Sequence, residues 1–79
     1  MNYRLLYFAS LRDRTGCAGE TLASSAADPR ALYQEIAQRY GVGLALERLR
    51  VAVNGEFAAW DTPLRDNDEV VFLPPVSGG

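Results

Sequence analysis

The stretch Val70-Val71-Phe72-Leu73-Pro74-Pro75 runs from purely apolar residues into two prolines. A short run of branched and aromatic residues favours a strand, and proline ends a sheet because its nitrogen carries no proton. Strands without alternating polar residues are typical of a sheet centre, where both faces are covered. A similar segment lies near the other end of the chain, where residues 3–9 are predicted as a strand. We therefore expect the first and last strands to pair in the middle of one sheet.

One amphipathic helix is predicted between these two strands. Asp28 can cap free backbone N–H groups at the start of a helix. Pro29 suits the first helical position, because a backbone N–H there would have no partner within the helix. From Leu32 to Tyr40 apolar residues recur every four positions, which places them on one face. Gly41 favours a helix end. The sequence therefore predicts a helix that starts after Asp28, ends before Gly41 and packs one side on a sheet.

Shorter elements complete the predicted order. Residues 10–15 are predicted as a helical turn and residues 20–23 as a second strand. In residues 50–59, two strand-like segments flank Asn54-Gly55, a pair that accepts the positive φ angles of a type I′ turn, so we expect a hairpin. A first and last strand paired centrally, with one main helix over a single face, is the β-grasp arrangement of ubiquitin-like proteins. The fold class expected is therefore α+β.

The composition argues against several kinds of site. All eight basic residues are arginines, set against ten acids, and the net charge of −2 offers no positive surface for a nucleic-acid backbone. Without histidine there is no imidazole base, and Cys17 alone cannot form a zinc or haem site. Without lysine there is no Schiff base. We therefore expect a non-catalytic chain that binds no cofactor, metal or nucleic acid.

Size and hydropathy indicate one small soluble domain. At 79 residues the chain has room for a single core, and 48% of it is hydrophobic. No apolar stretch approaches the ~20 residues needed to span a bilayer, and the opening residues lack the pattern of a signal peptide. A single cysteine forms no internal disulfide, which is typical of a cytoplasmic protein. We therefore expect a cytoplasmic location and, since no stretch can span a bilayer, no membrane partner.

The last residues differ in character from the rest. We expect a β-grasp domain over residues 1–73 and an extended, flexible tail over residues 74–79. The two prolines favour an extended exit, and six residues at ~3.3 Å each reach about 20 Å. Gly78 and Gly79 have no Cβ, so the tail can pass through a slot too narrow for other residues. A terminal carboxylate on such a stalk suits activation as an acyl adenylate in another protein's active site.

Several segments resemble the small subunit of molybdopterin synthase. They are Val51-Ala-Val-Asn-Gly-Glu56, Asp61-Thr-Pro-Leu-Arg-Asp-Asn-Asp-Glu-Val70, Phe72-Leu-Pro-Pro-Val-Ser-Gly-Gly79 and the opening Leu6-Tyr-Phe-Ala-Ser-Leu-Arg12. The resemblance covers nearly the whole chain, and its most specific part is the Pro-Pro-Val-Ser-Gly-Gly ending. Asn67 stands where relatives commonly have glycine, but asparagine also enters the left-handed region, so the fold is not in doubt.

The resemblance implies a sulfur carrier for molybdenum cofactor biosynthesis. An adenylating enzyme related to ubiquitin-activating enzymes would use ATP to join Gly79 to AMP, and a persulfide-bearing sulfurtransferase would convert the adenylate to a thiocarboxylate. In a heterotetramer with the large subunit, the carrier would give its sulfur to cyclic pyranopterin monophosphate. The catalytic lysines and phosphate-binding arginines would belong to the large subunit. The residues inserted into its pocket would be Pro74, Pro75, Val76, Ser77 and Gly78.

Alternation along the central strands predicts a docking surface. If Tyr7 faces the helix, Phe8 faces the opposite side, and Leu73 of the last strand does the same. Phe57 on the return strand of the hairpin would join them, because one helix covers only one face. Arg12 matches the opening of the resembling family and is a candidate charge contact with acidic partners. The resemblance implies that this surface binds both the large subunit and the activating enzyme.

Alternative functions share much of this pattern. A sulfur carrier of the thiamine pathway, or of another thiolation pathway, would have the same fold and Gly-Gly ending. A protein-conjugating modifier would pass the same adenylate to a lysine of its target. A non-covalent ubiquitin-like interaction module would leave the tail unused. A persulfide relay at Cys17 is disfavoured, because the chain has no histidine or lysine to generate its thiolate.

Overall fold

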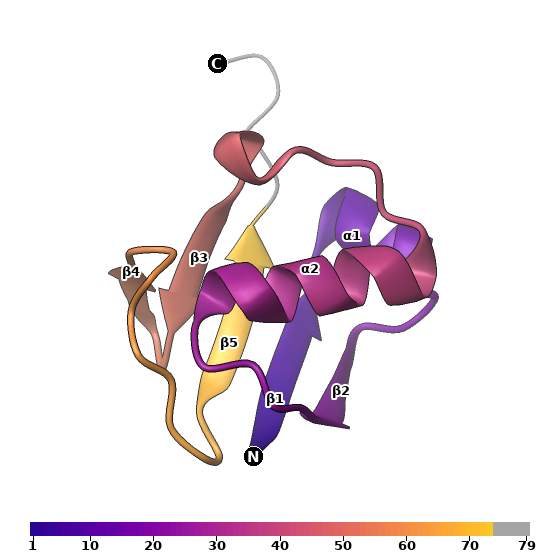
Figure 1. Cartoon of the computed structure of the whole chain (residues 1–79). Coiled ribbons are helices and arrows are strands. Elements are labelled where there is room, and N and C mark those ends of the chain that lie inside the picture. The colour runs from indigo at the N-terminus through magenta and orange to yellow at the C-terminus, as the bar shows by residue number, and fades with distance from the viewer. Residues whose placement is uncertain (74–79) are drawn as a thin grey trace.

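The computed structural model of the chain describes residues 1–73 (Figure 1). In chain order the elements are β1 (Asn2–Tyr7), α1 (Ala9–Thr15), β2 (Gly19–Ala23), α2 (Pro29–Tyr40), a 3-10 turn (Leu46–Arg48), β3 (Arg50–Val53), β4 (Glu56–Ala58) and β5 (Glu69–Leu73). The strands form one mixed five-stranded sheet, and α2 lies across one face of it.

The first and last strands pair in the centre of the sheet, as the sequence predicts. The strand order is β2-β1-β5-β3-β4. Strands β1 and β5 are parallel, with Leu5 beside Val70 and Tyr7 beside Phe72. The three other pairings, β1 with β2, β3 with β4 and β3 with β5, are antiparallel. The predicted α+β class and β-grasp arrangement are therefore confirmed.

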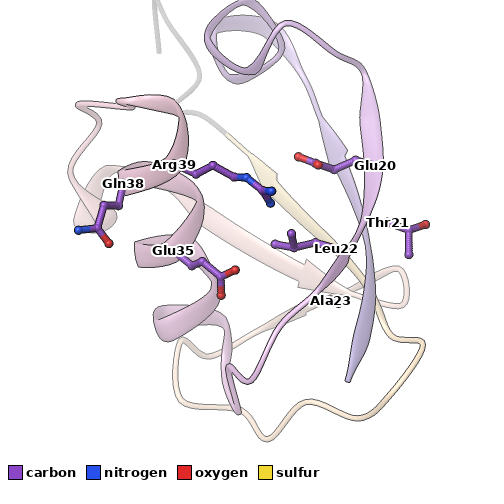
Figure 2. A pocket seen from close by; sticks show the side chains of 7 residues that line it. All are labelled: Glu20, Thr21, Leu22, Ala23, Glu35, Gln38 and Arg39. Atoms are coloured by element: carbon purple, nitrogen blue, oxygen red, sulfur yellow. The ribbon is translucent and has the colours of Figure 1, made fainter.

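The main helix begins and ends where its capping residues predict. Asp28 Oδ1 accepts the backbone N–H of Ala31 at 2.8 Å, and Pro29 is the first helical residue. At the other end Gly41 has a φ of 67°, a left-handed conformation that glycine adopts without steric cost. The second half of α2 lies beside β2, and a groove remains between the two elements (Figure 2).

One hydrophobic core fills the space between α2 and the sheet. Trp60 lies at its rim, where its ring stacks on Phe72 with the centroids 5.9 Å apart, so its role is packing. The completely buried side chains come from α2 and from the inner faces of β1 and β5. They are Tyr3, Leu5, Leu32, Ile36, Val70 and Phe72.

The first strand is shorter than predicted, and the helical turn after it is longer. Strand β1 ends at Tyr7, not at residue 9, because the Phe8 carbonyl accepts the N–H of Leu11 at 3.0 Å and so begins α1. Ala9 makes the change of direction with a φ of 48°, a conformation that costs an L residue about 1–2 kcal/mol. Helix α1 then runs for seven residues and ends at Gly16, which has a φ of 78°.

Candidate functional site

The tail that should carry the chemistry lies outside the described residues, while its root lies inside them. The described part of the chain ends at Leu73, the last residue of β5, in the centre of the sheet between β1 and β3. The predicted tail residues outside the described part are Pro74, Pro75, Val76, Ser77, Gly78 and Gly79.

The predicted alternation of the central strands is confirmed. Tyr7 and Phe72 point into the core with exposed fractions of 1% and 0%. Leu6 and Val71 point the other way and are only half-buried. Helix α2 covers the inner face (Figure 1), and α1 packs its buried Leu11 into the same core. The outer face of the sheet is thus open at its two central strands.

Apolar side chains form a row across this outer face. The pairing places Leu6 beside Val71, Val71 beside Ala52, and Ala52 beside Phe57, so the row crosses β1, β5, β3 and β4. Phe57 at the end of the row is 71% exposed. An exposed aromatic ring on a sheet face, continuous with other apolar side chains, is typical of a protein-binding surface.

The row continues toward the root of the tail. Leu73 lies two residues beyond Val71 on β5, about 7 Å along the strand. The parallel register pairs Tyr7 with Phe72, and Phe8 and Leu73 are the residues that follow these two. Phe8 is 47% exposed and Leu73 is half-buried. Phe57 does not lie directly beside Leu73. Ala52 of β3 and Val71 of β5 lie between them and make the surface continuous. We call this surface the outer apolar patch; it consists of Leu6, Phe8, Ala52, Phe57, Val71 and Leu73.

Two arginines border the patch at its tail end. Arg50 is exposed and lies opposite Leu73 in the register of β3 and β5. Arg12 is exposed on α1, and its N–H donates to the Phe8 carbonyl at 3.4 Å. Neither guanidinium forms an ion pair with a carboxylate of residues 1–73. The role predicted for Arg12, a charge contact with acidic partners, stays a prediction.

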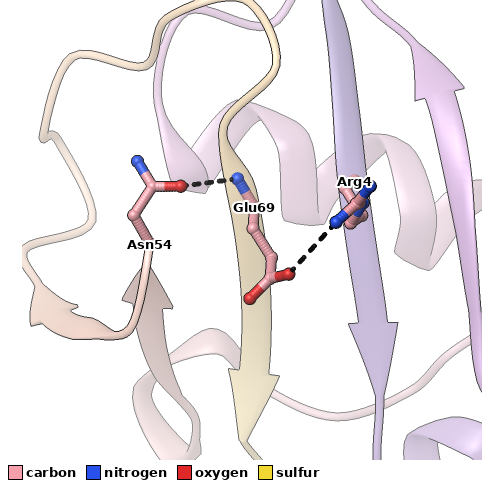
Figure 3. Close-up of polar contacts among 3 residues, drawn as sticks. All are labelled: Arg4, Asn54 and Glu69. Carbon is pink, nitrogen blue, oxygen red and sulfur yellow. Dashed lines mark hydrogen bonds and ion pairs between the residues drawn. The ribbon is translucent and has the colours of Figure 1, made fainter.

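The opposite end of the outer face is polar and closes the patch (Figure 3). Arg4 Nη1 lies 3.9 Å from Glu69 Oε2, and the two side chains are 70% and 37% exposed. Exposed pairs of this kind contribute little to stability. The apolar surface of the outer face therefore ends at these two charged side chains.

The hairpin that presents Phe57 is fixed to the start of β5. Asn54 and Gly55 have φ angles of 53° and 86°, as a type I′ turn requires. The Asn54 N–H donates to the Glu69 carbonyl at 2.8 Å, and Asn54 Oδ1 accepts the Glu69 N–H at 2.9 Å. Asn54 Nδ2 also donates to Asp68 Oδ1 at 2.9 Å. One asparagine therefore sets the position of β4 relative to β5 (Figure 3).

A buried polar contact near Cys17 has a structural role. The hydroxyls of Tyr7 and Tyr40 donate to Glu20 Oε2 at 2.7 and 2.6 Å, which ties β1, α2 and β2 together. Burial, and then the hydrogen bond to Glu20, raise the pKa of Tyr7; for Tyr40 the hydrogen bond is the larger cause of its raised pKa. Both phenols therefore stay protonated donors. Cys17 is half-buried beside Thr15, with Sγ 3.9 Å from Oγ1.

The described residues hold no other recognisable centre. No group of three metal-ligating side chains occurs within residues 1–73. Neither helix of this part of the chain is long and apolar enough to cross a membrane.

One residue of the patch was missed in the sequence. Ala52 was read only as part of a strand, yet it connects Val71 to Phe57. A two-residue turn at Asn54-Gly55 forces Ala52 to lie opposite Phe57, so the signal was present in the hairpin register.

The fold and the open outer face define a ubiquitin-like β-grasp protein. The solution structure of small archaeal modifier protein 1 from Methanosarcina acetivorans has the same fold, with a TM-score of 0.81 and 24% identity over 99% of this chain and 96% of that one.

The chain belongs to the ThiS family, whose model matches residues 5–79. It is 37% identical to the molybdopterin synthase sulfur carrier subunit of Escherichia coli (strain K12), over 96% of this chain and 98% of the relative. It is also similar to one chain in the complex of subunits 1 and 2 of molybdopterin-converting factor from Helicobacter pylori 26695. That match has a TM-score of 0.70 and 25% identity and covers 100% of both chains. The family resemblance seen in the sequence is therefore confirmed.

Proposed function

We propose that this chain is a sulfur carrier for molybdopterin synthesis and that Gly79 carries the sulfur as a terminal thiocarboxylate. The observation that carries the proposal is the family match over residues 5–79, together with 37% identity to a molybdopterin synthase sulfur carrier subunit. In this proposal residues 1–73 form the docking domain and residues 74–79 form the tail that enters the active sites of partners.

Activation follows the chemistry of a carboxylate. An oxygen of the Gly79 carboxylate attacks the α-phosphorus of ATP, and pyrophosphate leaves. The terminal sulfur of a protein persulfide then attacks the glycyl carbonyl carbon and displaces AMP. A thiol cleaves the resulting S–S bond, so the thiocarboxylate stays on Gly79 while the thiol and the sulfur donor form a disulfide. The adenylating enzyme binds the ATP, and this chain holds no cofactor or metal of its own.

The outer apolar patch is the docking surface in this proposal. It lies at the root of the tail, since Leu73 belongs to both the patch and the end of β5. The complex of subunits 1 and 2 that contains a similar chain supports a large subunit as one partner. The adenylating enzyme uses the same patch. Because one surface serves both partners, the carrier leaves the first before it binds the second.

Catalysis then belongs to the partners. The chain has no histidine and no lysine, so it offers no ordinary general base for the steps after activation. The large subunit supplies the groups that bind cyclic pyranopterin monophosphate and assist the attack of the thiocarboxylate sulfur. Two loaded carriers complete one dithiolene. These reactions take place in the cytoplasm, where the ATP for activation is available.

The test is reconstitution with purified partners. The sulfur-loaded chain is mixed with the large subunit and cyclic pyranopterin monophosphate, and the dithiolene product is measured. We expect product from the loaded chain and none from the unloaded chain. A loaded chain that gives no dithiolene but supports thiazole formation would assign it instead to the thiamine pathway.

A further inference from the structure

Among residues 1–73, β2 is an edge strand, and one row of its backbone groups pairs with no other strand of this part of the chain. The Tyr7 N–H donates to the Ala18 carbonyl, and the Ser24 N–H donates to the Met1 carbonyl, each at 2.8 Å. In an antiparallel pair, alternate residues direct their N–H and C=O groups toward the partner strand. Glu20 and Leu22 therefore face β1 with their backbone groups. The groups of the intervening residues, Gly19, Thr21 and Ala23, point away from the sheet.

This edge lacks most of the features that block pairing with another strand, and its one charged residue, Glu20, is already held by the hydroxyls of Tyr7 and Tyr40. Residues 19–23 contain no proline and no lysine, and the residues at the free edge have small side chains. The opposite edge strand, β4, has only three residues and begins at Glu56. The two edges are thus unequal, and β2 is the one suited to strand addition.

A groove accompanies the free edge on the helix side of the sheet (Figure 2). It is an open cavity of about 570 Å³ between β2 and the second half of α2. A strand added to β2 would place alternate side chains in this groove and the others on the outer face. Its lining residues are Glu20, Thr21, Leu22, Ala23, Glu35, Gln38 and Arg39.

Charges of opposite sign lie one helical turn apart along the groove. Glu35 and Arg39 both extend from α2 toward it (Figure 2). Within residues 1–73 these two side chains form no ion pair with each other. Ser24 Oγ donates to Glu35 Oε1 at 2.6 Å, which orients the carboxylate and leaves its second oxygen for another donor. If a second copy lies alongside in the antiparallel direction, the negative end of one groove faces the positive end of the other.

We propose that a second copy of this chain binds here, as a two-fold symmetric dimer in which the two β2 strands pair antiparallel about Thr21. Thr21 then exchanges both backbone hydrogen bonds with Thr21 of the other copy, and Gly19 pairs with Ala23. The reversal brings Glu35 opposite Arg39 of the other copy, twice per dimer, as an isologous contact requires. The dimer continues the sheet across both copies.

The dimer does not compete with docking of the large subunit. Strand order puts β2 at one edge and β4, with Phe57, at the other. Leu73 lies in the central strand, so the root of the tail stays accessible in both copies. The inference therefore stands apart from the proposed function and survives or fails independently of it.

Sedimentation equilibrium from micromolar to millimolar concentration tests the proposal, because an edge contact between small domains is weak. We expect a monomer–dimer equilibrium. Amide exchange measured over the same range should slow at Gly19, Thr21 and Ala23 as dimer accumulates, while Glu20 and Leu22 are protected at every concentration.

Two kinds of variant separate this contact from others. Thr21→Pro removes an N–H that makes no bond within the sheet, so the domain should fold and the dimer should be lost. Arg39→Glu should weaken the dimer about tenfold or more by placing two carboxylates together. The double variant Glu35→Arg/Arg39→Glu should restore dimerisation. Arg30→Glu, the same change at the exposed first turn of α2, is the control and should leave it unchanged.

Two results would overturn the proposal. One is a protein that stays monomeric at millimolar concentration, which would leave the β2 edge to a strand of a different protein. The other is a dimer that persists in folded Thr21→Pro and Arg39→Glu variants, which would place the contact elsewhere. If Thr21→Pro does not fold, Arg39→Glu and its control Arg30→Glu decide, since both arginines are exposed.

Discussion

Phe57→Ala should separate docking from folding. The side chain of a phenylalanine has roughly 200 Å² of accessible surface. At 71% exposure, about 140 Å² of Phe57 is left for a partner to cover. At ~25 cal/mol per Å², full coverage contributes about 3.5 kcal/mol to binding and half coverage about 1.8 kcal/mol. We therefore expect the affinity for the large subunit to fall by ~20-fold to ~400-fold. The loss of stability should be about 1.5 kcal/mol or less, because only about 60 Å² of the side chain is buried on folding.

Calorimetric titration with the large subunit, together with thermal unfolding of the free chain, measures both effects. Phe72→Ala is the matched control, since Phe72 is 0% exposed on the same sheet. It should cost about 3–5 kcal/mol of stability. If Phe57→Ala lowered the melting temperature as Phe72→Ala does, or left the affinity unchanged, the docking surface would lie elsewhere.

Substitutions at three further residues test separate parts of the account. Cys17→Ser should still form the thiocarboxylate, since the acceptor is a carboxylate; loss of loading in the folded variant, seen by mass spectrometry, would restore the relay hypothesis. Arg12→Glu should slow association with an acidic partner at low salt and leave the melting temperature unchanged; an equal rate at low and high salt in the unaltered chain would argue against a charge contact. Asn54→Ala should cost about 2–3 kcal/mol in chemical unfolding, because it removes two side-chain hydrogen bonds and strains a left-handed residue. Asn54→Gly should cost only about 1 kcal/mol, and equal losses would show that backbone strain plays no part.

The elements that the sequence predicts well are those whose signals are local. Asp28, Pro29 and Gly41 define α2 by capping alone, and the structure places its ends there. Residues 70–73 are all apolar, and this alone predicts a central strand without knowledge of the strands that pair with it. The turn at Asn54-Gly55 follows from two residues that tolerate positive φ.

The features that escaped prediction depend on distant residues. Glu20 accepts hydrogen bonds from Tyr7 and Tyr40, which are 13 and 20 positions away, and no periodicity brings these three residues together. The end of β1 depends on Phe8, whose carbonyl is taken by α1 in place of the sheet. A strand pattern that continues through Phe8 and Ala9 cannot reveal that competition.

The outer apolar patch was predicted in part. Parity along β5 places Leu73 on the outer face, as predicted, while Phe8 lies beyond the end of β1 and is 47% exposed. The connection to Phe57 runs through Val71 and Ala52, and it depends on the pairing of β3 with β5. That pairing joins segments from different parts of the chain, so the sequence alone indicated the members of the patch but not its continuity.

The most direct test of the central claim is the intact mass of the chain after incubation with ATP, an activating enzyme and a persulfide donor. We predict a mass increase equal to the exchange of one oxygen for sulfur, located on the peptide that ends at Gly79. A chain without Gly79 should gain nothing, because its carboxylate lies one residue, or ~3.3 Å, short of the reacting atoms. Unchanged mass in the full chain, or equal sulfur loading of the shortened chain, would contradict the account.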